Sequence, residues 1–398
     1  MSDLVVVGIG ADGWTGLGEP GRAAISAADV VLGGERHLDL LPASVRAARV
    51  PWPSPLLPAL PGLLETHRER AVCVLASGDP MFHGIGATLV RLVGAERVRV
   101  LPHPSSVSLA AARLGWPLAS TEVLSLVNAP VATVLGLVNP GRRILVLSAG
   151  AQTPGRLAAL LAEHGFGESP MTVLEQLGGP AERIHTGRAS SWTHPPGDPL
   201  NVVAIDCAGG PAVSLVPGLP DALFDSDGQL TKREIRAVTL SALRPVPGEL
   251  LWDVGAGAGS IAIEWMRSHR SCRAIAVESA ADRVARIERN ADTLGVPGLR
   301  VVHGRAPAAL HGLPTPDAVF IGGGVTRDGV VQACLDALSP GGRLVANAVT
   351  LESEAILASW YAKLGGDLTR IAVNRAAPIG GFTGWRAMMP VTTWSVTR

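Results

Sequence analysis

The sequence LLWDVGAGAGS, residues 250–260, carries the clearest structural signal in the chain. Its first five residues form a short apolar run, typical of a buried parallel strand, and a helical pattern begins near Ser260. Glycines between a strand and a helix N-terminus allow a tight turn and bring free backbone N–H groups close to a ligand. The sequence therefore predicts a cofactor cradle at this turn.

Two classes of cofactor suit such a loop. A dinucleotide-binding loop has the spacing G-x-G-x-x-G, whereas residues 255–259 have G-x-G-x-G and Ser260 stands where the third glycine belongs. The next expected strand, residues 273–277, ends in Glu278, where an acid can accept hydrogen bonds from ribose hydroxyls. This acid suits NAD as well as S-adenosylmethionine, so a nicotinamide-dependent oxidoreductase remains an alternative at this point.

Composition limits the classes of protein that the chain can belong to. Its 398 residues suggest two or three domains, and 34 basic and 34 acidic residues cancel, so nothing demands a nucleic-acid partner. The four cysteines are isolated in apolar runs without metal-ligand spacing, which predicts buried thiols in a reducing cytoplasm. No basic leader and no long apolar window appear, so we expect neither a secretion signal nor a membrane span.

Short apolar runs alternate with helical patterns in both halves, which predicts an α/β protein. The texture changes around 208–220, where glycine and proline leave little that could form a regular element. We therefore expect domains at 1–208 and 221–398, joined by a linker at 209–220. The proline-rich stretch Pro51–Pro61 is expected to be a surface loop. The expected strands lie at 4–9, 30–32, 71–76, 98–101, 123–127, 144–147, 171–174, 202–205, 250–254, 274–277, 300–302, 318–321 and 344–348, with a final strand at 387–396 that could pair with 368–373.

The N-terminal half carries a second loop, VLASGDPMFHGIG at residues 74–86, between an expected strand and an expected helix. It resembles the Gly-Asp-Pro loop of the tetrapyrrole methylases, and VLGGERHL at 31–38 resembles the branch that methylates a precorrin at C-5. The resemblance covers residues 1–207 and implies a tetrapyrrole methylase fold. Asp79 is a candidate catalytic residue, with turn capping as the alternative. The resemblance implies that the cofactor contacts Gly78, Asp79, Phe82, Ile85, Ser105 and Ser106.

The C-terminal half resembles another family over most of residues 221–398. FDSDGQLTKREIR at 224–236, together with the 250–260 loop and Gly322–Gly324, is similar to class I, Rossmann-like methyltransferases that decarboxylate and methylate a precorrin at C-15. Thr231 and Glu234 also have capping-box spacing. Arg305 stands where this family usually has an adenine-binding acid. The resemblance implies that the cofactor contacts Thr231, Asp253, Gly255, Ala256, Gly257, Ala258, Gly259, Glu278 and Ala306.

Together the two halves resemble the bifunctional decarboxylating precorrin methyltransferases of cobalamin synthesis. The resemblance implies two S-adenosylmethionine sites, methylation of precorrin-6B at C-5 and C-15, and loss of CO2 from the C-12 acetate to give precorrin-8X. No metal is required, and a homo-oligomer is expected. Arg233 and Arg236 are the expected catalytic clamps for substrate carboxylates, with Arg343, Arg375 and Arg386 as further candidates. The alternatives are a tandem methylase acting on another substrate and a scaffold with one degenerate domain.

Overall fold

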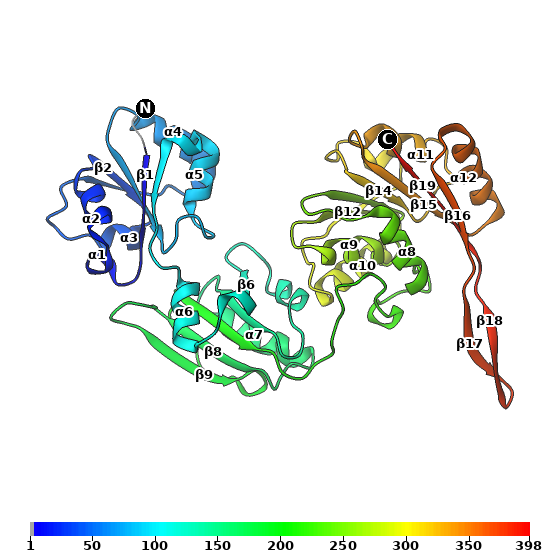
Figure 1. The fold of residues 1–398 in the computed structure, drawn as a ribbon, viewed down its shortest axis with the longest axis horizontal. Helices are drawn as coiled ribbons and strands as arrows, with labels where there is room; N and C mark the ends of the chain where they lie inside the picture. Colours follow the sequence, from blue (N-terminus) through cyan, green and yellow to red (C-terminus); the bar gives the residue numbers. More distant parts are fainter. Residues whose placement is uncertain (1–3) are drawn as a thin grey trace. The chain divides into compact units, whose positions relative to one another are not determined.

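The computed structural model describes residues 4–398, and these form two compact units (Figure 1). The N-terminal unit runs to Val131 and resumes at Val138–Pro211, whereas the C-terminal unit contains Ala132–Leu137 and Ala212–Arg398. Both units combine parallel strands with helices, so the expected α/β class is confirmed. Each unit is described by itself below.

The first sheet of the N-terminal unit is parallel and has five strands in the order β3-β2-β4-β1-β5. Because parallel strands are buried on both faces, they consist of nearly continuous apolar runs. Val6 and Val74 face one core, against α4 and α5, while Val7 and Leu75 face the other, against α2 and α3. The elements are β1 (Leu4–Ile9), α1 (Gly13–Gly16), α2 (Glu19–Ser26), β2 (Val30–Gly33), α3 (Glu35–Asp39), β3 (Ala48–Pro51), α4 (Leu56–Thr66), β4 (Val72–Ser77), α5 (Ile85–Val93) and β5 (Val98–Leu101).

The second sheet of this unit is mixed, with the strand order β6-β7-β10-β8-β9. Strands β6 and β7 run parallel, whereas β10 is antiparallel to both β7 and β8. Helix α6 packs its apolar face on this sheet, with Val107 and Ala110 beside Leu145 and Val202. The elements are α6 (Ser106–Leu114), β6 (Glu122–Ser125), β7 (Arg143–Leu147), α7 (Thr153–Glu163), β8 (Pro170–Glu175), β9 (Arg183–Arg188) and β10 (Asn201–Asp206).

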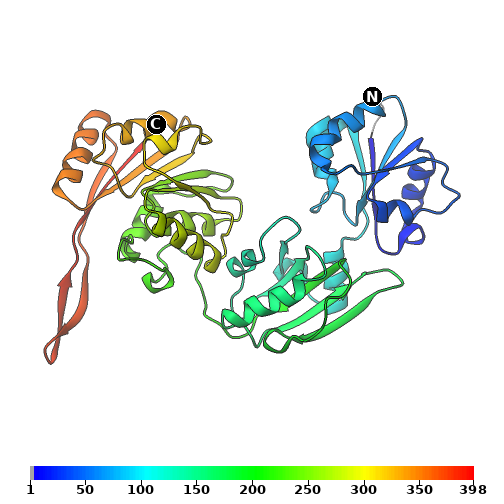
Figure 2. The same cartoon turned by 180° about the vertical axis from the view of Figure 1, so that it is seen from behind.

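The C-terminal unit is built on a seven-stranded sheet in the order β13-β12-β11-β14-β15-β19-β16 (Figure 2). Five strands run parallel from β13 to β15, and β19 is antiparallel to both of its neighbours. Helices α8, α9 and α10 bury residues against one face, and α11 and α12 against the other. The elements are α8 (Arg233–Leu243), β11 (Leu250–Val254), α9 (Ser260–Ser268), β12 (Arg273–Glu278), α10 (Ala281–Thr293), β13 (Arg300–His303), β14 (Ala318–Ile321), α11 (Val330–Ala337), β15 (Arg343–Ala348), α12 (Leu351–Leu364), β16 (Asp367–Ile371) and β19 (Val391–Thr397).

A separate hairpin interrupts the last two strands of this sheet. Strands β17 (Asn374–Ile379) and β18 (Phe382–Ala387) pair only with each other among the described residues and extend away from the sheet (Figure 1). The expected pairing of a final strand with the 368–373 region is confirmed, because β16 pairs with β19. The link between them is this hairpin, which the sequence pattern did not predict.

Three elements, α4, β3 and β9, differ from the sequence-based expectation. The stretch expected to be a loop at Pro51–Pro61 contains the start of α4. Pro58 lies in the first turn, where no N–H is needed, and Pro61 lies inside the helix, which buries one face through Leu60 and Leu64. Strands β3 and β9 were not expected, since both are short edge strands with little apolar periodicity. The expected linker at 209–220 has no regular element, yet its Leu219 is buried in the C-terminal core.

Candidate active sites in the two units

The glycine loop of the C-terminal unit has a geometry that only glycine supplies at low cost. Gly255, Gly257 and Gly259 have φ of 71°, 60° and 76°, in the left-handed region. A Cβ on Gly255 would lie 2.7 Å from the Cα of Gly323, and one on Gly257 would lie 3.0 Å from the carbonyl oxygen of Gln229. The loop therefore passes close to two other backbone segments before α9 begins.

A cavity of about 550 Å³ lies beside this loop, at the carboxyl ends of the parallel strands. Six of the nine expected cofactor residues of this unit line it: Thr231, Gly255, Ala256, Gly257, Glu278 and Ala306. The other three do not line it: Asp253, Ala258 and Gly259. The cofactor contacts expected from the sequence at these last three positions are therefore not supported by the geometry of the cavity.

Glu278 ends β12 and is held rigidly at the cavity wall. Its Oε1 accepts hydrogen bonds from the backbone N–H groups of Ser279 (2.8 Å) and Ala280 (3.0 Å), and its Oε2 accepts one from Gly257 (2.9 Å). A carboxylate has room for about four such bonds. The Ser279 hydroxyl makes a further, longer contact to Oε1 at 3.5 Å, whereas within residues 4–398 Oε2 accepts only the bond from Gly257. Oε2 therefore retains accepting capacity for a ligand hydroxyl group.

Asp253 is buried beneath the glycine loop and supports it. It is 1% exposed, and its Oδ2 accepts a hydrogen bond from the backbone N–H of Ala262 at 3.0 Å, which fixes the first turn of α9 to the end of β11. Its Oδ1 is buried without a hydrogen-bond partner among the described residues. Burial, with a further contribution from the charge of Glu278, raises the pKa of Asp253 to about 7. Asp253 thus supports the cradle rather than bordering the cavity.

Residues 229–232 cover one side of this cavity. The sequence predicts that Thr231 caps the following helix, but that prediction is wrong, because the cap position is Lys232 and no side chain bonds there. The Thr231 carbonyl instead accepts a hydrogen bond from Arg236 Nη1 at 2.5 Å. Glu234, the expected partner in the capping box, binds Arg375.

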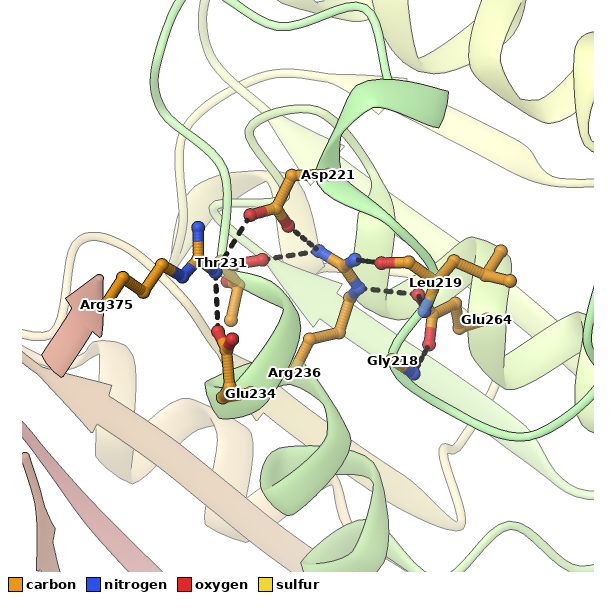
Figure 3. A network of polar contacts seen from close by, with 8 residues as sticks. All are labelled: Gly218, Leu219, Asp221, Thr231, Glu234, Arg236, Glu264 and Arg375. Carbon is orange, nitrogen blue, oxygen red and sulfur yellow. Dashed lines mark hydrogen bonds and ion pairs between the residues drawn. The ribbon is translucent and has the colours of Figure 1, made fainter. Parts of the chain in front are cut away.

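Arg236 anchors this segment from inside the protein (Figure 3). The side chain is fully buried, and its Nε donates to Glu264 Oε1 at 2.5 Å. Its Nη2 donates to the carbonyl of Leu219, and its Nη1 reaches both the Thr231 carbonyl and Asp221. The expectation that Arg236 clamps substrate is therefore wrong, because its charge is compensated inside the unit and its atoms are out of a ligand's reach.

The same network continues to the hairpin (Figure 3). Asp221 contacts Arg236 with one carboxylate oxygen, and its other oxygen lies 3.3 Å from Arg375 Nη2 on β17. Arg375 also binds Glu234 at 2.5 Å and holds the pKa of that carboxyl below its usual value. The base of the hairpin is thus tied to the segment that covers the cavity, and Arg375 is engaged in structural ion pairs.

The remaining expected clamps lie elsewhere. Arg233 is exposed and does not line the cavity. Arg343 binds both carboxylate oxygens of Glu249 and donates to the Leu243 carbonyl, which is a structural role. Arg386 lies on β18, in register with Arg375. None of the three faces the cavity, because a charge beside a glycine-rich loop in the sequence need not point into that loop's pocket.

Four other cations line this cavity, and one of them, Arg283, is paired with Asp227. The remaining three are Lys232, Arg305 and Arg327. No acidic partner is recorded for any of them within residues 4–398. The sequence left two roles open for Lys232, a solvated helix face or a contact to substrate carboxylates, and it assigned no role to Arg327. A signal for Arg327 existed in the sequence, because it follows Gly322–Gly324 at the carboxyl end of β14, the edge where ligands bind in parallel sheets.

The N-terminal unit has its own cavity, of about 380 Å³. It is lined from both sheets, by the ends of β1 and β4 on one side and by residues of β8 and β10 on the other. All six expected cofactor residues of this unit line it: Gly78, Asp79, Phe82, Ile85, Ser105 and Ser106. The sequence motif therefore located the wall of this cavity, although not the part contributed by the second sheet.

Close backbone packing shapes this wall. Gly78 has φ of 54°, and a Cβ there would lie 3.0 Å from Ser105 Cα. A Cβ on Gly8 would lie 2.0 Å from the Gly78 carbonyl oxygen, so the end of β1 and the loop after β4 touch through their backbones. Ser105 caps α6 by accepting a hydrogen bond from the N–H of Ser108 at 3.1 Å.

Several polar side chains lie on or near this wall, and some of them also stabilise turns. Asp79 Oδ1 accepts a hydrogen bond from the N–H of Met81 at 2.9 Å, so Asp79 does cap its own turn while it lines the cavity. His103 lies 3.3 Å from Asp12 and is outside the lining, whereas His83 belongs to it. Arg36 and His37, which belong to the motif at residues 31–38, both line the cavity.

Comparisons with known proteins match each part of the chain to a separate family model. Residues 3–192 match the family model of tetrapyrrole (corrin/porphyrin) methylases, and residues 222–398 match that of the precorrin methyltransferase domain. The chain is 50% identical, over 99% of its length and 96% of the relative's, to a precorrin-6Y C(5,15)-methyltransferase (decarboxylating) of a Sinorhizobium species. The chain belongs to the precorrin-6Y C5,15-methyltransferase family.

Further relatives cover the whole chain or its C-terminal part. A Mycobacterium tuberculosis precorrin-6Y C(5,15)-methyltransferase is 50% identical over 99% of this chain and 100% of its own. The crystal structure of the C-terminal domain of the Rhodobacter capsulatus precorrin-6Y C5,15-methyltransferase is 49% identical, with a TM-score of 0.45, and covers 47% of this chain and 100% of that one.

Residues 4–398 contain no group of three or more histidine, cysteine, aspartate or glutamate side chains that could hold a metal ion. In the same range, no helix combines the length and the apolar character that crossing a bilayer requires. The four cysteines are buried and unpaired, as their sequence context predicts.

Proposed function

We propose that this chain transfers two methyl groups from S-adenosylmethionine to a precorrin, one at each cavity. The N-terminal unit methylates precorrin-6B at C-5. The C-terminal unit methylates C-15 and removes CO2 from the C-12 acetate, so that the product is precorrin-8X of cobalamin synthesis. The observation that carries this proposal is the presence of two cavities with glycine-lined walls on one chain whose relatives bear both activities in their names.

The residues present fit S-adenosylmethionine at both cavities. In the C-terminal unit the Gly255–Gly257 backbone would admit the cofactor at close range, and Glu278 would accept hydrogen bonds from its ribose. In the N-terminal unit the loop at Gly78 and the backbone at Ser105 form the corresponding wall. The bound cofactor supplies an activated methyl group, so the protein mainly has to position the macrocycle and exclude water.

The three unpaired cations of the C-terminal cavity support a substrate rich in carboxylates. Lys232, Arg305 and Arg327 can each donate hydrogen bonds to a carboxylate, and each arginine offers two parallel N–H donors. The substrate carboxylate that leaves as CO2 must not be paired with a cation, whereas the other carboxylates bind the cations and hold the substrate. Decarboxylation can use the conjugated macrocycle as the electron sink, which requires no nucleophile from the protein.

The test is mass spectrometry of the products formed from precorrin-6B and S-adenosylmethionine. The proposal expects a gain of two methyl groups and a loss of one CO2. An unchanged substrate would overturn it in favour of the alternative, a tandem methylase acting on another compound. Calorimetric titration with S-adenosylhomocysteine should find two sites per chain, whereas one site would support a degenerate domain.

We also propose that the chain acts as a homo-oligomer in the cytoplasm. The β17–β18 hairpin exposes three large apolar side chains, Ile379, Phe382 and Trp385. Exposed apolar side chains of this size favour association between protein surfaces. Four unpaired thiols suit a reducing compartment. Sedimentation of the full chain measures the oligomeric state, and a monomer at micromolar concentration would contradict that part of the proposal.

A further inference from the structure

A compact polar cluster lies on the wall of the N-terminal cavity, apart from the glycine loops. Arg36 and His37 belong to α3, and Ser77 is the last residue of β4. Arg36 Nη2 lies 2.8 Å from His37 Nε2 and 3.1 Å from Ser77 Oγ, and His37 Nε2 lies 2.8 Å from Ser77 Oγ. All three residues line the cavity.

The chemistry of this cluster fixes the state of the histidine. A guanidinium can only donate hydrogen bonds, so His37 Nε2 must accept from Arg36 and carries no proton. Burial and the neighbouring charge of Arg36 lower the pKa of His37 to about 4. The imidazole is therefore neutral near pH 7, with its proton on Nδ1.

Packing alone does not explain this ring orientation. His37 Nδ1 is buried and has no hydrogen-bond partner among residues 4–398. A buried donor without an acceptor is unfavourable, so the ring satisfies Arg36 at the expense of its own second nitrogen. An arrangement with this cost indicates that the orientation of Arg36 matters at this wall.

The charge of Arg36 stays available to a ligand. Its recorded hydrogen-bond partners are a neutral imidazole and a hydroxyl, neither of which cancels a positive charge. The charge of Asp198 acts on Arg36 from a distance, but the two side chains form no ion pair among residues 4–398, and the carboxylate oxygens of Asp198 accept hydrogen bonds from Gln176 and from the backbone of Leu200. Arg36 is exposed on the cavity side, unlike the buried and compensated Arg236 of the other unit.

We propose that Arg36 binds a side-chain carboxylate of the tetrapyrrole at the C-5 methylation site, and that neutral His37 and Ser77 hold its guanidinium in position. This inference rests on the proposed function of the N-terminal unit. His37 is a positioning residue: if it were protonated it would repel Arg36 and could no longer accept its hydrogen bond. Arg36 offers the planar pair of donors that matches a carboxylate.

The test uses the full chain with precorrin-6B and S-adenosylmethionine, following C-5 methylation by product mass. Arg36→Ala is expected to raise KM for precorrin-6B in this step by roughly 10- to 100-fold, the effect of losing a hydrogen bond to a charged group. Arg36→Lys should restore part of the loss. His37→Leu should raise KM less than Arg36→Ala does, and His37→Gln, which can still accept a hydrogen bond, should recover towards wild type.

Two controls separate the possible outcomes. Arg91→Ala removes an exposed arginine that contacts Thr88 and lies outside the cavity lining, so its KM should equal that of wild type. Titration with S-adenosylhomocysteine should give wild-type affinity at both sites of Arg36→Ala, which also shows that the variant is folded. Weaker binding of S-adenosylhomocysteine would assign Arg36 to the cofactor and overturn the inference, as would an unchanged KM. If the wild-type chain itself fails to methylate C-5, the proposed function fails instead.

Discussion

Replacing Gly255 with alanine tests whether the glycine loop of the C-terminal unit binds the cofactor. A Cβ at this position would lie 2.7 Å from both the Cα and the nitrogen of Gly323 and 2.8 Å from its carbonyl oxygen. All three are backbone atoms, so no side-chain rotation can relieve the contact. In addition, alanine would have to adopt the left-handed conformation at φ of 71°, which costs roughly 1–2 kcal/mol.

The clash falls on the wall of the cavity, because both Gly255 and Gly323 line it. Overpacking of this kind costs typically about 1–3 kcal/mol. If the loop moves away from Gly323 to escape, it moves into the space that the cofactor needs. Since about 1.4 kcal/mol corresponds to a factor of ten in affinity, we expect binding of S-adenosylhomocysteine at this site to weaken roughly 10- to 100-fold.

Isothermal titration of the full chain measures this effect with an internal reference, since the N-terminal site should keep its wild-type affinity. Gly312→Ala is the matched control: its φ is 75°, and nothing lies within 4 Å of the added Cβ. It therefore reproduces the backbone strain without the clash or the cavity. Wild-type binding at both sites of Gly255→Ala would refute the assignment of this loop to the cofactor.

Three further predictions follow from the C-terminal unit. Arg236→Leu leaves Glu264 buried without its cation and should lower the free energy of unfolding by roughly 3–5 kcal/mol in urea titrations, whereas Arg289→Ala, which removes an exposed ion pair, should change it by less than about 1 kcal/mol. Burial raises the pKa of Asp253 from 3.8 to about 7, so this group stabilises the fold at low pH and its contribution to stability is lost as pH rises through about 7. Asp253→Asn should remove this part of the decrease of Tm with pH in thermal melts. An unchanged dependence of Tm on pH in the variant would contradict the argument. Lys232→Ala and Arg327→Ala should each raise KM for precorrin-6B in the C-15 step by about tenfold without weakening S-adenosylhomocysteine binding; equal KM values would remove both residues from substrate binding.

Much of the fold could be predicted because its strands are local apolar runs. The runs at Leu4–Ile9 and Leu250–Val254 coincide with β1 and β11, and the glycines after each strand mark turns that backbone sterics alone enforce. The hairpin β17–β18 could not be found in this way. Its strands are exposed on both faces, so burial imposes no clear periodicity on their sequence.

The cavities could be predicted only in part, since walls from distant segments leave no local signal. The N-terminal cavity takes Gly78 and Asp79 from a recognisable loop, but Leu174 and Asn201 come from the second sheet. Which side chains of β8 and β10 face the first sheet depends on strand pairing, and the sequence does not specify that pairing. Residue type thus located one wall of the site, and the tertiary fold supplied the other.

Arg236 shows how helical phase decides between two roles for the same residue type. The segment that contains it has Arg233 three positions earlier, and charge alone makes both candidate clamps. In α8, however, Arg236 shares a face with Leu240 and Leu243, four and seven positions later, and both leucines are buried. That phase placed Arg236 in the core and Arg233 outside. A buried guanidinium needs compensating polar partners, and for Arg236 they include the carboxylate of Glu264 on α9, 28 residues further along. The apolar periodicity of α8 therefore indicated a buried, structural role for Arg236. A charged residue in a helix can be assigned to substrate binding only after its position on the buried or the exposed face is known.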